Sequence, residues 1–383
     1  MDIIRPFEAA VGAILVLTVL WDAFETLVLP RRVTRKFRLA RGYYIIVWAV
    51  WGAIARSMRP GKFRELFLSI FGPLSLLFLF VLWAVFLVFG FALMHRGVGG
   101  AVASTGEPMS FLLDLYLSGT TFFTLGLGDV IPRSTLDRTI TVTECALGFG
   151  FLAMVIGYLP ILYQSFSRRE ITISLLDARG GSPPSAAELL KHFGKPEQRD
   201  ALHDLLVEWE RWSADMLESH LSYPVLVYYR SQHDNQSWLG ALTAILDTSA
   251  LCIVGMDKAK NLQARLTFAM ARHAATDIAQ TIRAAPKPLP NDRLPARELE
   301  RLRAALGGSG LCPACGADSE ARLIELRHTY EHYVNGLSQR LVMALPPWIP
   351  EGEAHYNWRT TAWERSEEGL AATAAVDERD NQR

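Results

Sequence analysis

The chain has 383 residues, half of them hydrophobic, with 39 basic and 39 acidic side chains and a formal net charge of zero. This length allows two or three domains, and the balanced charge gives no reason to expect a nucleic-acid partner. Long apolar runs lie at 7–29, 66–95 and 139–163, whereas the chain after about Ser165 has the mixed composition of a soluble protein. We therefore expect a membrane-embedded first part and a soluble second part.

Each of the three apolar runs is long enough for a membrane-spanning helix, which needs about 20 residues. In the second run, Gly72 and Pro73 are expected to interrupt the helix, leaving 74–95 as the span and 62–71 as an interfacial lead-in. The first run is longer than the apolar core of a signal peptide and ends without a small-residue cleavage site, so we interpret it as a retained helix.

The segment 42–55 is rich in Tyr and Trp but short for a span, and basic residues flank it on both sides. Positive residues stay on the cytoplasmic side, and two cytoplasmic flanks exclude a single crossing. We favour an aromatic helix lying in the interface, and hence three spans with an extracellular N-terminus rather than four. Asp22 and Glu25 are intramembrane charges that could be functional, or could pair with the basic residues of 31–41.

Between the second and third spans, Ser110 is expected to cap a half-helix that is too short to cross the membrane. A loop with glycines at alternate positions follows it. Its residues are Thr124, Leu125, Gly126, Leu127, Gly128 and Asp129.

This loop pattern suits the passage of cations. An ion that sheds its hydration shell needs replacement oxygens, which the inward-turned carbonyls of four extended loops can supply. Turning successive carbonyls to one side requires positive φ, which glycine adopts most readily, and this accounts for Gly126 and Gly128. The half-helix would point its partially negative C-terminus toward the ion cavity.

The loop resembles the selectivity filter of the potassium channel family, which reads T-x-G-x-G-D. The match includes Pro132, three residues after the aspartate, and Gly148, where the family often has a gating hinge in its inner helix. The resemblance covers residues 73–165. It implies a potassium-selective pore with potassium ions in the filter and, since the chain holds one filter, a homotetramer.

Leu127 departs from that family, which most often has tyrosine there. Leucine cannot hydrogen-bond to the pore helix, so the filter could be less stiff. Two alternatives stay open: a weakly selective cation channel, and a membrane-anchored sensor or scaffold whose pore does not conduct.

The third span is expected to line the cavity and act as a gate. Gly148 and Gly150 would soften the helix, and Pro160 would disturb its hydrogen bonding near the cytoplasmic end. Glycine in membrane helices also serves close packing. Glu144 could face the cavity and attract cations, or lie behind the filter and brace it; the sequence does not choose.

The second half shows helical periodicity with hardly any strand pattern. No glycine-rich nucleotide-binding motif follows a strand, and a cyclic-nucleotide β-roll has no support. We expect a cytosolic helical bundle. Its helices are expected at 185–194, 197–221, 237–255, 258–284, 296–306 and 318–345.

Two features of this half invite a ligand interpretation. The stretch from His220 to His233, running on to Trp238, is dense in aromatic and polar residues. It suits either a ligand pocket or, as we favour, a helix corner with buried aromatics. A Cys-His spacing typical of zinc fingers lacks the apolar positions of a true finger, and we expect no metal there. Its residues are Cys312, Cys315, His328 and His332.

We therefore expect an all-α protein that joins a tetrameric cation-channel pore module in the plasma membrane to a cytoplasmic helical domain. We expect no enzymatic activity and no cofactor apart from the permeant ion. The expected segments are an N-terminal part at 1–65, the pore domain at 66–170, a linker at 171–186, the helical domain at 187–365 and a disordered tail at 366–383.

Overall fold

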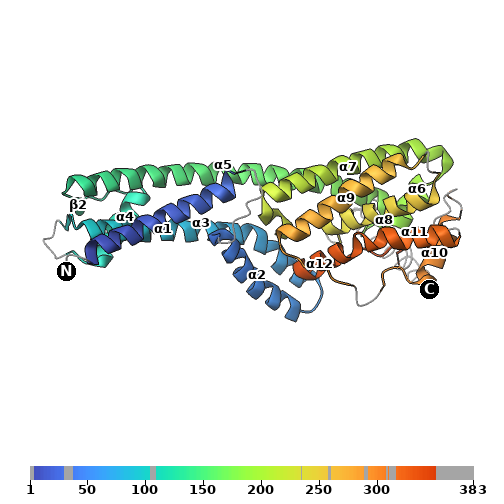
Figure 1. The fold of residues 1–383 in the computed structure, drawn as a ribbon, viewed down its shortest axis with the longest axis horizontal. Helices are drawn as coiled ribbons and strands as arrows, with labels where there is room; N and C mark the ends of the chain where they lie inside the picture. The colour runs from blue at the N-terminus through green and yellow to red at the C-terminus, as the bar shows by residue number, and fades with distance from the viewer. Residues whose placement is uncertain are drawn as a thin grey trace, which may run out of the picture. The chain divides into compact units, whose positions relative to one another are not determined.

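The computed structural model of the chain describes residues 4–29, 38–103, 109–233, 235–257, 260–288, 292–307, 309 and 316–350. The chain divides into two compact units. The first, here called the membrane unit, comprises Met1–Ser165 together with Leu221–Tyr229; the second, here called the helical unit, comprises Phe166–His220 and the chain from Arg230 onward. Nearly all regular structure in the described residues is helical (Figure 1), which confirms the predicted all-α class.

The membrane unit is built on two long helices that lie side by side, α1 (Ile4–Leu27) and α3 (Lys62–Val98) (Figure 1). Glycines permit their close approach. A Cβ atom on Gly12 would lie 2.4 Å from the carbonyl oxygen of Gly90, and a Cβ on Gly97 would lie 2.6 Å from that of Ala9. Small residues at contact points are typical of helices packed in a membrane.

The α3 helix runs unbroken for 37 residues with Pro73 inside it, so the predicted interruption at Gly72 and Pro73 is wrong. Proline removes only one hydrogen bond of the ladder, and its neighbours can maintain the helix around it. The aromatic helix α2 (Leu39–Ser57) packs against α3, and Tyr43 donates a hydrogen bond to the carbonyl oxygen of Ser75 at 2.8 Å.

The two acidic residues of α1 are buried and partnered. Asp22 accepts hydrogen bonds from the backbone N–H of Ala40 and from the Trp83 indole, at 2.9 and 3.0 Å. Glu25 lies 3.6 Å from Arg38, one member of the basic segment expected to pair with it. These contacts hold α1 against α2 and α3. Asp22 and Glu25 therefore have a structural role in packing the three helices.

After α3 come two short antiparallel strands and two further helices. Strand β1 (Ala101–Ala103) pairs with β2 (Val130–Pro132), and the short helix α4 (Phe111–Phe122) lies between them in the chain. Ser110 caps α4 as predicted, because its side chain accepts from the N–H of Leu113. The pore helix of the predicted channel is therefore present with its expected start.

Helix α5 (Thr135–Gly180) is 46 residues long and contains Pro160. This helix differs from the expected domain organisation in two ways. The predicted linker at 171–186 is helical as far as Gly180, and the boundary between the two units falls inside the helix, between Ser165 and Phe166. Pro160 does not end the helix, for the same reason as Pro73.

The helical unit contains helices close to those expected. They are α6 (Ala186–Phe193), η1 (Pro196–Gln198), α7 (Arg199–Ser222), α8 (Trp238–Gly255), α9 (Leu262–Thr281), α10 (Ala296–Leu306), α11 (Ala317–His328) and α12 (Glu331–Leu341). The expected helix at 318–345 is two helices, which separate at Thr329 and Tyr330.

Helix α8 is the core of the helical unit. In the part of the chain that the structure describes, four helices are long and apolar enough to cross a membrane, namely α1, α3, α5 and α8, but 83% of the α8 window is buried inside the protein. A helix that is apolar on all sides and covered by its own unit is a core helix. Asp247 at its centre is fully buried and paired with Arg293 at 2.6 Å, and Tyr330 donates to it at 2.5 Å.

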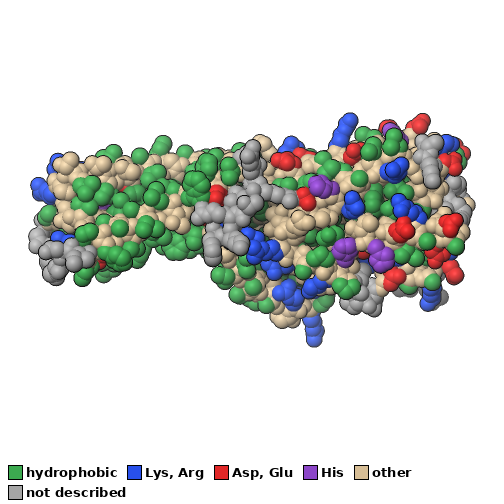
Figure 2. Space-filling model, in the orientation of Figure 1, with side chains coloured by type: hydrophobic (Ala, Val, Ile, Leu, Met, Phe, Trp, Pro, Cys, Tyr) green, Lys and Arg blue, Asp and Glu red, His purple; other side chains and the backbone are tan. Residues whose placement is uncertain are grey.

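The two units differ in surface chemistry. Figure 2 shows hydrophobic side chains spread over the visible face of the membrane unit, whereas Lys, Arg, Asp and Glu are frequent over the helical unit. On α1, large apolar side chains recur at helical spacing and are exposed, among them Phe7, Ile14, Leu17 and Trp21. This is the surface expected of a helix that faces lipid.

Candidate functional site

The predicted filter loop follows α4 directly and ends at β2, so it is held at both ends. In a single chain every residue from Phe123 to Asp129 is exposed, and Leu125 and Leu127 are each 64% exposed. Irregular backbone at membrane depth is tolerated only where protein covers it or where it lines a water-filled cavity. Within the single chain, no protein covers the loop.

The loop has the alternating backbone expected from its sequence. Gly126 and Gly128 have φ of 56° and 80°, in the left-handed region. Thr124 shares this conformation with φ of 58°, which the sequence did not lead us to expect. A β-branched residue is strained there, by about 1–3 kcal/mol, and such strain is concentrated at functional sites.

Hydrogen bonds turn the start of the loop back toward α4. The carbonyl oxygen of Thr120 accepts from the N–H of Leu125 at 2.7 Å and from that of Gly126 at 3.3 Å. The N–H and C=O groups of a trans peptide point in opposite directions. The carbonyls of Thr124 and Leu125 therefore point away from α4, as oxygens that coordinate an ion would.

The outer end of the loop is held by a side-chain contact from α4. The Tyr116 side chain interacts with the carboxylate of Asp129. Asp129 Oδ1 also accepts from the N–H of Val130, the first residue of β2. The last predicted filter residue is thus connected both to the pore helix and to the strand that follows.

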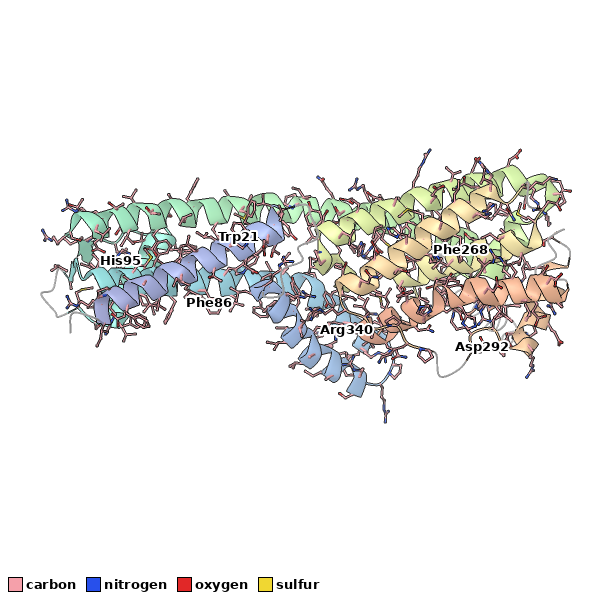
Figure 3. All side chains as sticks on the ribbon, in the orientation of Figure 1. Trp21, Phe86, His95, Phe268, Asp292 and Arg340 are labelled. Carbon is pink, nitrogen blue, oxygen red and sulfur yellow. The ribbon has the colours of Figure 1, made fainter. Side chains whose placement is uncertain are left out.

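Glu144 is fully buried, which selects between its two predicted roles. Its carboxylate contacts the ring of His95 at 3.0 Å and the hydroxyl of Ser118, so it does not face the cavity. The other ring nitrogen of His95 lies 2.5 Å from Asp137. His95 lies near the end of α3 (Figure 3), Ser118 belongs to α4, and Asp137 and Glu144 belong to α5, so three helices meet at this cluster.

The sequence analysis missed three members of this cluster, His95, Ser118 and Asp137. The sequence nevertheless contains a signal that could have identified Asp137 and His95. Asp137 and Glu144 are about two helical turns apart and share one face of α5, and His95 is an ionisable residue at the end of an apolar span.

Gly148 and Gly150 prove to have different surroundings. A Cβ on Gly148 would lie 2.1 Å from the carbonyl oxygen of Phe122, the last residue of α4. A Cβ on Gly150 would meet nothing within 4 Å in the single chain, and Pro160 continues the helix. Gly148 thus packs against the end of α4, and a hinge role for Gly148, Gly150 and Pro160 stays a prediction.

The stretch beginning at His220 forms a helix corner, as we favoured. Residues Leu221–Tyr229, here called the coupling segment, belong to the membrane unit and include the 3-10 helix η2 (Pro224–Tyr228). Tyr228 stacks on Tyr44 of α2 with ring centroids 5.9 Å apart and packs against Trp48 and Phe71, at 4.7 and 5.0 Å. Its aromatic residues are thus covered by α2 and α3.

The coupling segment also contacts α5. Tyr223 packs edge-on against Tyr158 with ring centroids 5.5 Å apart, and Tyr158 is two residues before Pro160. At its other end, the ring of Tyr229 lies so close to α3 that a Cβ on Gly72 would be 2.6 Å from it. The segment therefore bridges the outer helix and the inner helix of the pore.

The predicted Cys-His pattern is only partly visible. Cys312 and Cys315 lie outside the described residues. His328 and His332 lie on different helices and border a cavity of about 580 Å³ between α10, α11 and α12. Within the part of the chain that the structure describes, no group of three or more His, Cys, Asp and Glu residues is placed to hold a metal ion.

Comparison with known proteins supports a channel. Residues 75–165 match the model of a family described as "Ion channel". The chain is 27% identical over 183 residues to the uncharacterized membrane protein YdjJ of Bacillus subtilis, which covers 47% of this chain and 52% of that protein. It is also 27% identical over 127 residues to the TWiK family of potassium channels protein 7 of Caenorhabditis elegans, covering 32% and 23%.

The chain thus spans about half or less of the curated relatives that it matches. No solved structure matches. The matched region contains the greater part of α3, all of α4, the loop and α5 as far as Ser165. The comparisons and the fold together support an ion-channel domain within a multi-pass membrane protein.

Proposed function

We propose that four copies of this chain form one passive, potassium-selective pore. The observation that carries this proposal is the loop backbone, with left-handed φ at Thr124, Gly126 and Gly128 and with its first N–H groups bonded to α4. Such a backbone presents carbonyl oxygens on one side, which is the coordination that a dehydrated potassium ion requires.

The tetramer is supported by what a single chain leaves uncovered. The loop is exposed throughout, and only 17% of the apolar α5 window is buried. Fourfold association would place the loops around one axis and cover the exposed faces of α5 with neighbouring chains. We place the helical unit on the cytoplasmic side of the plasma membrane, in keeping with Arg168 and Arg169 after the inner helix.

We also infer that the helical unit gates the pore, through α5 and through the coupling segment. Helix α5 passes from the membrane unit into the helical unit without a break. The coupling segment leaves the helical unit after His220, contacts α5 at Tyr158, and returns to the helical unit at Arg230. A movement of the helical unit can therefore act on the inner helix directly along α5 and, through the coupling segment, at the contact between Tyr223 and Tyr158.

The test is ion flux through the purified protein in liposomes under opposing potassium and sodium gradients. We expect a reversal potential near the potassium equilibrium value. Current that reverses near zero would instead favour a weakly selective cation channel, which Leu127 permits. A further variant carries mutations in the coupling segment, so that the segment no longer links the helical unit to the pore. If this variant also passes no current, a scaffold with a non-conducting pore is favoured.

A further inference from the structure

Four buried polar side chains from three helices, one of them the pore helix α4, form a cluster. They are His95 of α3, Ser118 of α4, and Asp137 and Glu144 of α5, and each is 0% exposed. The imidazole lies between the two carboxyl groups, with contacts of 2.5 Å to Asp137 and 3.0 Å to Glu144. Ser118 contacts the second oxygen of Glu144. Buried ionisable groups at membrane depth persist only when they are partnered, and these are.

The single hydroxyl hydrogen of Ser118 limits which hydrogen bonds the cluster can form. Ser118 Oγ also lies 2.7 Å from the carbonyl oxygen of Val88. A carbonyl only accepts, and a serine hydroxyl carries one hydrogen, so both contacts of Ser118 are full hydrogen bonds only when Glu144 donates to it. In this geometry Glu144 acts as a carboxylic acid that donates to Ser118 and accepts from the His95 ring.

The cluster sets the position of α4, and α4 sets the position of the loop. Ser118 lies in the same helical turn as Thr120, whose carbonyl oxygen accepts the N–H groups of Leu125 and Gly126. A shift of α4 at Ser118 would therefore be passed to the loop through these two bonds. Because Ser118 is tied to α3 at Val88 and to α5 at Glu144, such a shift is resisted from both sides.

The centre of the filter loop has no side chain that could form a hydrogen bond to the pore helix. Leu127 has no hydrogen-bonding side chain and is exposed in the single chain. The described contacts between the loop and the pore helix are made by backbone groups at its inner end and by Asp129 at its outer end. Within one chain, the position of the loop therefore depends on the position of the pore helix.

We propose that Ser118, Glu144, His95 and Asp137 are positioning residues that hold the filter in its ion-binding form. This inference rests on the proposed potassium channel function. It predicts that breaking the cluster weakens potassium binding in the filter without touching any residue of the loop.

The experiment compares the thermal unfolding of the full-length purified tetramer in equal concentrations of potassium and sodium chloride. Ion binding to the folded state alone raises its unfolding temperature, and this readout does not require an open gate. The parent protein is expected to unfold at a higher temperature in potassium. Ser118→Ala and Glu144→Ala are expected to lose at least half of this potassium-dependent shift and to raise the sodium-to-potassium permeability ratio about tenfold.

Two further variants make the test specific. Glu144→Gln supplies an amide that can donate to Ser118 and accept from His95, so it is expected to keep the shift. Glu8→Gln is the matched control, because Glu8 of α1 pairs with Arg96 of α3 at 3.1 Å and is not one of the four cluster residues or bonded to them. This variant is expected to show the same potassium-dependent shift in unfolding temperature as the parent protein.

The possible outcomes separate the two proposals. A full potassium-dependent shift in both Ser118→Ala and Glu144→Ala would overturn the positioning role and leave the channel proposal intact. A parent protein that shows no potassium-dependent shift would contradict the potassium filter itself and, with it, the inference that rests on it. If Glu144→Ala does not assemble, Ser118→Ala, which removes a single oxygen atom, decides the matter.

Discussion

Gly148 of α5 lies directly against the backbone of Phe122, the residue at which α4 ends, and a Cβ there would be 2.1 Å from the Phe122 carbonyl oxygen. Real Cβ contacts are not this short, so any larger residue must push the inner helix and the pore helix apart. The contact gives Gly148 a role that a flexible hinge would not require, namely to let α5 reach the base of the filter loop.

Gly148→Ala is expected to reduce potassium flux at least about tenfold, the effect of ~1.4 kcal/mol on a rate. The cause is displacement of α4 and of the loop bonded to it. Gly157→Ala is the matched control, since a Cβ there meets nothing within 4 Å. Liposome flux measures the effect. If both variants were equally impaired, helix flexibility rather than packing at Gly148 would be the cause.

Gly126→Ala is expected to abolish flux without preventing tetramer assembly. Gly126 has φ of 56°, and an L-residue there is strained by about 1–2 kcal/mol, so the carbonyl orientation is expected to change. Flux and the size of the detergent-solubilised assembly are measured together. Gly119→Ala on α4, where a Cβ would be 4.0 Å from the nearest atom, is the control. Normal conduction by Gly126→Ala would disprove the filter assignment.

Gly72→Ala tests the coupling segment. Its Cβ would overlap the ring of Tyr229, so the segment has to move away from α3 and its contact with Tyr158 is expected to loosen. We expect the open probability of single channels to change several-fold at an unchanged potassium-to-sodium permeability ratio. Gly42→Ala on α2 adds the same methyl group in open space. An unchanged open probability in Gly72→Ala would argue against this route of gating.

His220 makes the stability of the helical unit depend on pH. Burial, with Arg169 3.3 Å away, lowers the pKa of His220 to about 3, from about 6.5 in an unfolded chain. The unfolded state therefore binds more protons below pH 6.5, and stability falls as the pH decreases from 6.5 toward 3. Between pH 6.5 and 4.5 the loss is about 2 kcal/mol.

The measurement is the unfolding temperature of the parent and of His220→Gln across this pH range. The variant should lose less stability on acidification, because it carries no group there to be protonated. His273→Gln is the control, because the His273 side chain is 59% exposed on α9. Parallel pH curves for the parent and His220→Gln would exclude the buried histidine as the source.

Asp247→Asn is expected to destabilise the helical unit by about 3–5 kcal/mol, since it leaves the buried guanidinium of Arg293 without its main partner. Chemical unfolding followed by tryptophan fluorescence measures the change. Asp215→Asn is the control, because Asp215 is half-exposed and its pair with Arg168 spans 3.8 Å. A loss below about 1 kcal/mol would show that Glu331 and the Pro346 carbonyl suffice for Arg293.

Local features of the fold were predictable wherever one residue determines one conformation. Ser110 marked the start of α4, and the two loop glycines have the positive φ that their spacing implied. Proline was a poorer guide, since Pro73 and Pro160 both lie inside helices. A single missing N–H is a small loss in a long helix whose other hydrogen bonds are protected by lipid.

Long-range relationships could not be predicted. His95 and Glu144 lie on different helices, and nothing local in the sequence assigns one as the partner of the other. The same holds for the coupling segment, whose composition favoured a helix corner over a pocket but did not say which helices cover it. Its membership in the membrane unit follows only from the packing of Tyr228 and Tyr223 on residues far away in the chain.

The path of the chain has a consequence for the design of shortened proteins. Because the backbone passes between the two units at Ser165, at His220 and again at Tyr229, no single cut separates them. A protein ended after the inner helix would lack the coupling segment and would leave Trp48 and Phe71 without the aromatic ring that covers them. Altered gating in such a truncation would therefore report a damaged membrane unit as much as a missing regulator, and the coupling segment would have to be supplied as a separate peptide before the two effects could be told apart.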